Sequence, residues 1–274
     1  MRYLGVSRDE LYSPNRAEGD SAVFRAVALE LERRGNQVIS MTEKELVSKG
    51  IPCDIDGIFQ MARSREALNV LKTASVPVTN SVWGVRNCGR SAQVGLLGGP
   101  VIIPDTVAAP ITILPEGWRN YPCWLKRGDS HAIEQDDVQF IREYGQLMAS
   151  IRGFAERGIK QYVIQAHVKG WVVKFYGVRG YGLTDCYAAS AENGKFGLER
   201  YNDQSDQASV DFKALTDLAE QAAKMLEVEI YGGDAVVGPD GEITFIDFND
   251  WPSFRTCTVG AAQKIADLII SKNR

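Results

Sequence analysis

Residues 233–249 constrain the fold of this chain more than any other segment. Two runs of apolar, β-forming residues flank the sequence Gly238-Pro239-Asp240-Gly241, in which Pro presets φ and Asp and Gly suit the positions that follow. The pattern predicts an antiparallel hairpin with a tight turn. If the two ends of this turn pair with each other, Asp234 in the first strand lies opposite Phe245 in the second.

The predicted hairpin carries three oxygen-bearing side chains on one face. Side chains alternate between the faces of a strand, so Asp234, Asp247 and Asn249 point the same way. Two carboxylates and a carboxamide, without His or Cys, suit a hard cation such as Mg²⁺, which usually accompanies substrate phosphates. The segment therefore indicates a metal and nucleotide site. Two alternatives stay open: an amphipathic hairpin with a solvated polar face, or a three-residue loop that shifts the register and separates the three side chains.

The composition is that of an ordinary globular chain. Its 274 residues, 45% of them hydrophobic and 24% charged, suffice for roughly one to three domains. The net charge of -4 argues against broad nucleic-acid binding. The five cysteines are scattered without a C-x-x-C motif, as expected for reduced thiols rather than disulfides or zinc. The N-terminus lacks an apolar signal-peptide core, and prolines interrupt the most apolar region, 94–114, so we expect a cytoplasmic protein without a membrane span.

Strand and helix patterns alternate in the first third of the chain. Short apolar runs predict strands at 2–7, 37–41, 56–61 and 76–79, and helical periodicity predicts helices at 21–34, 42–49 and 64–74. This order implies a parallel sheet covered by helices. The pattern changes after Gly89. There we expect helices at 91–97, 136–157, 211–227 and 260–271, and strands at 122–126, 161–168 and 171–178, with a Pro-rich connector before 122.

Two lysines lie in apolar strands, where a charge needs an explanation. Lys126 ends one predicted strand, and Lys174 lies inside another. A buried lysine needs an anionic partner, and a polyphosphate would serve because lysine is a compact charge with three donors. The loop Gly128-Asp129-Ser130-His131 after Lys126 can direct backbone N–H groups at phosphate oxygens. Alternatively, Lys126 is an exposed charge at a strand end and Lys174 reaches solvent from a sheet face.

The order of these features is more specific than any one of them. Along the chain come Lys126, the polar loop, a helix, Gln165-Ala166-His167-Val168-Lys169-Gly170, Lys174, Asp234 and Asp247-Phe248-Asn249. Over roughly residues 80–265 this order resembles the ATP-grasp superfamily. The resemblance implies an α/β fold that is α+β in its C-terminal part. Residues 1–88 would form an N-terminal parallel α/β domain, 89–168 a connector and small central lid, and 169–274 a mostly antiparallel sheet domain with the metal site.

The resemblance also implies a cofactor and its ligands. In this family ATP lies between the lid and the C-terminal domain, with one or two Mg²⁺. The implied contacts are phosphates at Lys126, Lys174 and Arg90, a closing loop with Ser130 and His131, main-chain contacts to adenine from Gln165 and Val168, and Mg²⁺ at Asp234, Asp247 and Asn249. Many members have Glu-x-Asn at the metal site. This chain has Asp-x-Asn, which shortens one ligand but keeps its charge.

Most members of this family phosphorylate a carboxylate, and an amine or thiol then attacks the acyl phosphate. The resemblance thus implies a Mg²⁺-ATP-dependent, ADP-forming ligase that acts on a small-molecule or peptide substrate. Two other functions stay open. One is a kinase that phosphorylates an alcohol, as the inositol-phosphate kinases of the superfamily do, and the other is a nucleotide-binding subunit without turnover. A homodimer is compatible with the sequence, which does not determine the oligomeric state.

A ligase of this kind needs cationic groups for the substrate carboxylate and the developing oxyanion. Lys174 is one candidate. Arg255 follows the metal strand, and six residues from the last metal ligand extend only about 20 Å. Arg200 and Arg63 are further candidates, and Arg63 ends a predicted strand where open α/β sheets bind ligands. Each arginine could instead be a surface charge. If Arg255 lies outside the site, we expect the acceptor near Arg63 and the loop 8–20.

Overall fold

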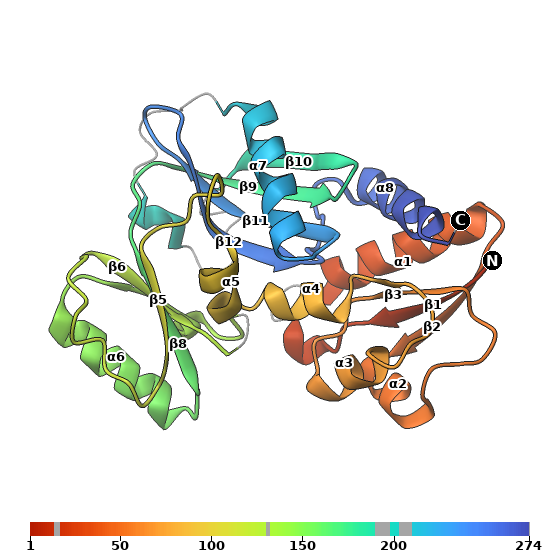
Figure 1. Cartoon of the computed structure of the whole chain (residues 1–274), viewed down its shortest axis with the longest axis horizontal. Helices are drawn as coiled ribbons and strands as arrows, with labels where there is room; N and C mark the ends of the chain where they lie inside the picture. Colours follow the sequence, from red (N-terminus) through yellow and green to blue (C-terminus); the bar gives the residue numbers. More distant parts are fainter. Residues whose placement is uncertain (14–16, 130–131, 190–197, 203–209, 274) are drawn as a thin grey trace.

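The computed structural model describes residues 1–273 except 14–16, 130–131, 190–197 and 203–209. In this part of the chain the strands form three sheets of four strands, one parallel and two antiparallel. The N-terminal and second sheets lie at opposite ends of the molecule, with the C-terminal sheet between them (Figure 1). The expected α/β fold with an antiparallel C-terminal part is therefore confirmed.

The N-terminal sheet has the strand order β2-β1-β3-β4 and is parallel throughout. Its strands are β1 (Arg2–Ser7), β2 (Gln37–Thr42), β3 (Gly57–Gln60) and β4 (Val78–Thr79). Helices α1 (Ala17–Arg33) and α8 (Thr258–Ser271) lie side by side on one face, and α2 (Glu43–Lys49) and α3 (Arg65–Leu71) cover the other (Figure 1). Alternation along β1 explains the two layers, because Tyr3 packs with α1 and Leu4 with α2 and α3.

The second sheet, here called the lid sheet, has the order β5-β8-β6-β7. It consists of β5 (Thr106–Pro110), β6 (Cys123–Arg127), β7 (Val138–Ile141) and β8 (Gln161–Ala166). Helix α6 (Tyr144–Glu156) packs on one face, where it meets Leu125 and Ile164. The neighbouring residues in these strands, Trp124, Lys126 and Gln165, therefore face away from α6.

Two elements of the lid sheet differ from the sequence prediction. The helix expected over 136–157 is helical only in α6, because a short 3₁₀ turn, η2 (Gln135–Asp137), and strand β7 take its first part. Residues 138–141 are rich in β-formers and pair with β6, and this tertiary pairing overrides the helical periodicity. Strand β5 lies in the segment expected to be a Pro-rich connector. It is an edge strand, which tolerates Pro110.

The C-terminal sheet has the order β10-β9-β11-β12 and is antiparallel. Its strands are β9 (Trp171–Val178), β10 (Gly182–Ala188), β11 (Ile230–Val237) and β12 (Ile243–Asp250). Helix α7 (Phe212–Met225) covers one face through Phe175, Phe245 and Phe248. Helices α4 (Val82–Asn87) and α5 (Arg90–Leu96) join the N-terminal sheet to the lid sheet (Figure 1). Strand β10 and helix α4 have no counterpart among the predicted elements.

The hairpin of β11 and β12 exists, but its predicted register is wrong. The loop has three residues, since Gly238 N–H donates to the Glu242 carbonyl at 2.9 Å and Val237 pairs with Ile243. This loop shifts the register by one residue. A β-bulge then inserts Ile246 as an extra residue, so that Asp234 lies opposite Asp247 rather than Phe245. The two irregularities cancel, and the common face predicted for the metal ligands is kept.

Every helix that the structure describes is too short or too polar to span a bilayer. All five cysteines are free thiols. The domain boundaries at residues 88 and 168 stay a prediction, although the three sheets follow one another in the same order along the chain.

Candidate active site

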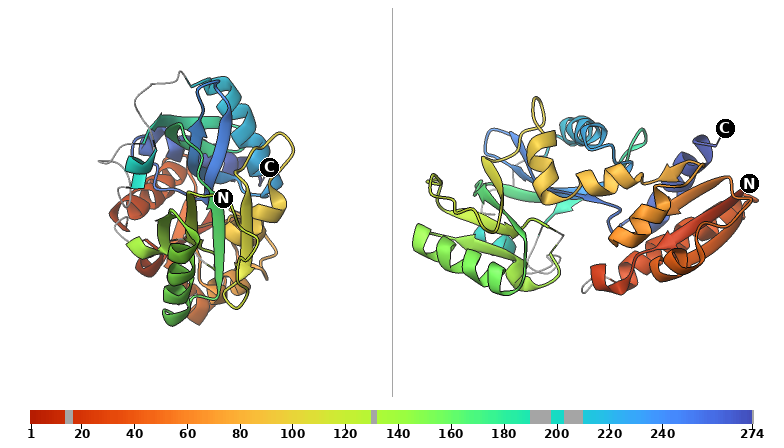
Figure 2. Two further views of the ribbon diagram at one scale, coloured as in Figure 1. Left: turned by 90° about the vertical axis from the view of Figure 1, so that its left-hand side faces the viewer. Right: turned by 60° about the horizontal axis from the view of Figure 1, so that its bottom comes forward.

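A pocket of about 330 Å³ is lined by residues from all three sheets. In the right-hand view of Figure 2 the C-terminal sheet lies between the lid sheet and the N-terminal sheet. The N-terminal sheet contributes the segments that follow β1 and β3. The lid sheet contributes the faces of β6 and β8 that point away from α6, and the C-terminal sheet contributes the face of β9, β11 and β12 opposite α7. Strand alternation thus places the polar residues of otherwise apolar strands in one cavity.

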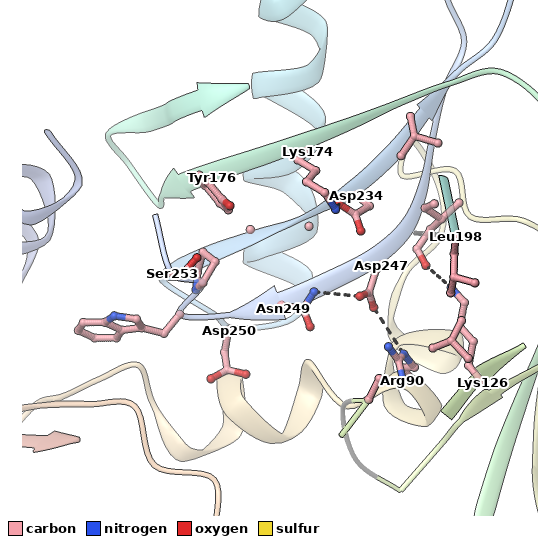
Figure 3. A pocket seen from close by; sticks show the side chains of 18 of the residues that line it. Arg90, Lys126, Lys174, Tyr176, Leu198, Asp234, Asp247, Asn249, Asp250 and Ser253 are labelled. Atoms are coloured by element: carbon pink, nitrogen blue, oxygen red, sulfur yellow. Dashed lines mark hydrogen bonds and ion pairs between the residues drawn. The ribbon is translucent and has the colours of Figure 1, made fainter. Parts of the chain in front are cut away.

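A row of charged side chains crosses the C-terminal sheet. Lys174 on β9 pairs with Asp234 on β11, which pairs with Asp247 on β12. The Lys174 ammonium lies 2.8 Å from an Asp234 oxygen, and Asn249 donates from Nδ2 to Asp247 at 3.0 Å (Figure 3). Arg90, at the start of α5, reaches Asp247 from the other side at 3.6 Å. The predicted metal residues therefore lie together, and both carboxylates are held by neighbouring donors.

The charge of Asp247 is stabilised by its neighbours. Burial alone raises the pKa of this carboxyl, but the cations Arg90 and Lys126 and the Asn249 amide outweigh burial, so the pKa lies below its ordinary value. Asp247 is consequently ionised at neutral pH and available as a hard oxygen ligand.

Lys126 is buried, with 8% of its surface exposed. Its ammonium donates to Gln165 Oε1 and to the Ile246 carbonyl, both at 2.7 Å. Burial lowers the pKa of Lys126 to about 8, while the charge of Asp247 opposes that shift. Arg90 lies nearby, and its buried Nε has no hydrogen-bond partner among the described residues. This end of the pocket therefore carries two cations, Lys126 and Arg90, beside the Asp247 carboxylate.

The residues predicted to contact adenine are placed differently from one another. Gln165 lines the pocket with its side chain, while its strand is paired on both edges by β5 and β6. Val168 is not among the lining residues, and its carbonyl accepts a hydrogen bond from Asn202 at 3.0 Å. The main-chain contacts predicted for these two residues thus have competing partners in this structure. Val172 and Ile246 supply apolar walls here.

An aromatic cluster joins the lid sheet to the segment before α7. Phe140 of β7 stacks on Tyr201 in the 3₁₀ turn η3 (Leu198–Tyr201), with ring centroids 4.2 Å apart. Trp124 donates from its indole nitrogen to His167 Nδ1 at 3.1 Å. Burial lowers the pKa of His167, which keeps the imidazole neutral. His167 is therefore a structural member of this cluster, and Leu198 lines the pocket beside it.

Three predicted site residues fall partly or wholly outside what the structure describes. Ser130 and His131 lie outside the described residues. Arg200 belongs to η3, but its side chain is likewise outside the described part. Their predicted roles stay predictions.

Arg255, the residue predicted to bind the acceptor substrate, lies elsewhere in the structure. Arg255 is exposed and does not line the pocket, because the chain turns away into α8 after Phe254. The six-residue separation of Arg255 from Asn249 limits how far Arg255 can lie from the metal residues, but it does not determine whether its side chain points into the pocket. Arg63 does line the pocket, together with Arg8, Asp20 and Asp250. Sequence reasoning named the loop 8–20, which contains Arg8 and Asp20, without singling out either residue, and it missed Asp250. Arg8 directly follows β1, a strand end where such sheets bind ligands.

The side chains at the centre of the pocket fit Mg²⁺ by their chemistry. Asp234, Asp247 and Asn249 offer only oxygen ligands on one face, without the His or Cys that zinc prefers. No group of three His, Cys, Asp or Glu side chains among the described residues would hold a metal by itself. The remaining ligands would have to come from water or phosphate, as is usual for Mg²⁺.

Comparison with solved structures shows that the chain has the fold of ATP-grasp proteins. D-alanine–D-alanine ligase from Bacillus anthracis, complexed with ATP, matches with a TM-score of 0.73 at 13% identity, over 100% of this chain and 97% of that chain. VanG D-Ala:D-Ser ligase from Enterococcus faecalis matches with a TM-score of 0.70 at 14% identity, over 100% and 99%. A RimK domain ATP-grasp protein from Sphaerobacter thermophilus matches with a TM-score of 0.67 at 16% identity, over 98% and 99%.

At these identities the similarity establishes the fold, so the ATP-grasp resemblance of the sequence is confirmed at that level. No protein-family model and no curated protein sequence matches the chain.

Proposed function

We propose that this chain is a Mg²⁺-ATP-dependent, ADP-forming ligase. It activates a carboxylate of a small molecule or peptide as an acyl phosphate, which an amine or thiol then attacks. The observation that carries the proposal is the row Lys174–Asp234–Asp247 facing Lys126 and Arg90 across one pocket. The solved structures with this fold include ligases, one of them in complex with ATP.

In this proposal the cations bind the phosphates and the carboxylates bind the metal ion. Lys126, Lys174 and Arg90 would neutralise and orient the phosphates, as compact or forked donors around the transferring group. Asp234, Asp247 and Asn249 would hold Mg²⁺. When bound, this ion supplies positive charge at the transferring phosphoryl oxygens. The electrostatic interactions of these five charged groups with the phosphates would be stronger in the buried pocket than in water, because the local dielectric constant is low.

The nucleotide base would lie between the lid sheet and the C-terminal sheet. Val172 and Ile246 provide apolar surface there, and the Gln165 side chain provides a polar contact. The Val168 carbonyl already accepts one hydrogen bond from Asn202, and it retains a second lone pair for a contact with the base. Closure of the loop with Ser130 and His131, and a role for Arg200, belong to the proposal as sequence-based expectations. Location in the cytoplasm, the three-domain division and a homodimer also remain predictions from the sequence.

Calorimetry with ATP in millimolar Mg²⁺ tests the binding part of this proposal. We expect one nucleotide per chain and no comparable binding after Mg²⁺ is chelated. ADP release with candidate acids and amines tests the ligase part, and the product distinguishes an amide or thioester from the phosphate ester of a kinase. A wild-type chain that binds no ATP in Mg²⁺ would rule the proposal out.

A further inference from the structure

Arg63 lies at the end of the pocket that the phosphate site does not use. It follows β3, and 10% of its side chain is exposed. Its Nη2 lies 2.7 Å from an Asp250 carboxylate oxygen and 3.3 Å from the Asp250 carbonyl. Asp250 and Lys126 are on opposite sides of Asp247 (Figure 3). Arg63 is therefore a cation at the far wall of the same cavity.

Arg8 also lines this end of the pocket, and it differs from Arg63 in how many of its nitrogens have hydrogen-bond acceptors. Arg8 donates from Nε to the Met61 carbonyl at 3.2 Å, from Nη1 to Asp20 at 2.9 Å and from Nη2 to the Trp251 carbonyl at 3.0 Å. All three of its nitrogens are thus engaged in holding the wall together. Arg63, in contrast, has a buried Nε without a hydrogen-bond partner among the described residues.

A buried charged donor without an acceptor is costly, so the missing partner at Arg63 is an acceptor. The guanidinium fork matches the two oxygens of a carboxylate. Burial lowers the pKa of Arg63 to about 10, with Asp250 opposing the shift, so the group stays cationic at neutral pH. Asp250, with 1% of its side chain exposed, fixes the orientation of the fork.

The position along β12 indicates which carboxylate would bind. Asp250 is three residues past Asp247, which corresponds to on the order of 10 Å along a strand. Asn249 lies next to Asp250, but Asp247 and the cation Lys126 lie farther along the pocket, so a carboxylate held at Arg63 is not the group that would receive the phosphoryl. An amino group two bonds from that carboxylate would project back toward the metal residues.

We propose that Arg63 selects the attacking substrate by binding its free carboxylate, so that the acceptor is an amino acid or short peptide rather than a simple amine or thiol. This inference rests on the ligase function proposed above. Arg8 and Asp250 are positioning residues in it, because they hold the wall and Arg63 without reaching the substrate.

The test is an ADP-release assay with wild-type protein, ATP, Mg²⁺ and the twenty L-amino acids, their D-isomers and simple dipeptides, offered singly and in pairs. For each active acceptor, the amide of its carboxylate is compared with the free acid. We expect the amide to lower kcat/KM at least tenfold. Arg63→Lys keeps the charge but loses the fork, so it should raise the acceptor KM at least tenfold and leave the KM for ATP unchanged. Arg25→Lys, an exposed arginine of α1, is the matched control.

Equal activity of acid and amide would overturn the inference. So would an Arg63→Lys enzyme that retains the acid preference, or a lack of any active amino acid or dipeptide in a chain that still binds Mg²⁺-ATP. A chain without ATP binding would contradict the proposed function instead. Because the comparison of acid with amide uses the wild-type protein, it decides the question even if a variant folds poorly.

Discussion

Asp247 lies in a site where cations outnumber carboxylates. Arg90, Lys126 and Lys174 surround it and Asp234, so the ligand-free pocket carries excess positive charge. The sequence alone suggests a different picture, a self-repelling acidic cluster that gains stability when one member is neutralised. The observed neighbours reverse that expectation, because each carboxylate now offsets buried positive charge.

Asp247→Asn should abolish turnover and also lower the free energy of unfolding of the ligand-free protein. The folded-state pKa of Asp247 is depressed, so its stabilising contribution is present above its unfolded pKa of about 4 and is lost as the pH falls through the folded value. Urea denaturation at pH 7 and pH 3 should show the difference from wild type shrink at the lower pH. Asp240→Asn, at an exposed turn position, is the control. A more stable Asp247→Asn protein at pH 7 would contradict this electrostatic account.

Lys126 should make ATP binding depend on pH. Its pKa of about 8 in the folded protein means that it loses its charge above that pH, so we expect ATP affinity to fall between pH 8 and about 10. Binding near pH 8 should take up protons, which calorimetry in buffers of different ionisation enthalpy detects. Without ligand the charged lysine is penalised by burial, so the unfolding free energy should rise across the same window. Lys126→Arg should bind with an affinity that is flat in pH; a flat wild-type profile would show that Lys126 does not contact the phosphates.

The sequence predicted those site residues whose side chains differ in polarity from the residues on either side of them in the chain. Lys126, Lys174 and Asp247 interrupt apolar strands, and a charge in such a strand is visible without a structure. Asp250 and Arg8 are equally central to the pocket wall, but each is ordinary in its own segment. Their role depends on the ion pair that they form with each other across 242 positions of the chain, and no local sequence pattern indicates such a pair.

The β11–β12 hairpin shows how much element geometry depends on single backbone positions. Gly241 has φ of +79° in the three-residue loop, a conformation that favours glycine. Gly238, which directly precedes this loop, does not have a positive φ, and a Cβ there would have 3.8 Å to its nearest neighbour. Sequence periodicity predicted both strands, but it could not place the bulge at Ile246, since a bulge changes pairing without changing composition.

Gly241→Ala should therefore destabilise the protein by about 1 kcal/mol or more, while Gly238→Ala should stay within about 0.5 kcal/mol of wild type. Chemical denaturation of the two variants side by side measures this difference. Since the loop sets the register of Asp234 against Asp247, Gly241→Ala should also weaken Mg²⁺-dependent ATP binding more than Gly238→Ala does. Equal behaviour of the two variants would mean that the loop does not control the register.

Across the whole molecule, a buried ion cluster ties the N-terminal sheet to the C-terminal sheet. Arg8 contacts Asp20 at 2.9 Å and Asp250 at 3.7 Å, and 7% of its side chain is exposed. Arg33, paired with Glu30 on the surface of α1, is 68% exposed. Removal of one partner from a buried cluster leaves uncompensated charges, whereas an exposed pair contributes little.

Arg8→Met should lower the free energy of unfolding by about 3–5 kcal/mol, and Arg33→Met by about 0–1 kcal/mol. Urea denaturation followed by tryptophan fluorescence reports both. If the two losses are similar, the cluster around Arg8 is solvated in solution and does not join the two sheets.

Mg²⁺-ATP should stabilise the three sheets together, because the pocket takes residues from each of them. At a free concentration of 100 times the dissociation constant, we expect the unfolding free energy to rise by about 2.7 kcal/mol. Thermal melting with ATP, with and without Mg²⁺, measures the shift. A melting curve in which only one of two transitions moves would show that the nucleotide leaves one part of the molecule unaffected.

The contact between Arg8 and Trp251 also means that the N-terminal sheet cannot be completed until the end of the chain has been synthesised. These residues are separated by 243 positions, and helix α8, which covers one face of the N-terminal sheet, is synthesised later still. At about 5–20 residues per second, the first strand waits roughly 10–50 s on the ribosome before its last neighbours emerge. During that interval the nascent chain exposes an uncovered apolar face, so its yield in a cell should depend on chaperones that bind it before translation ends.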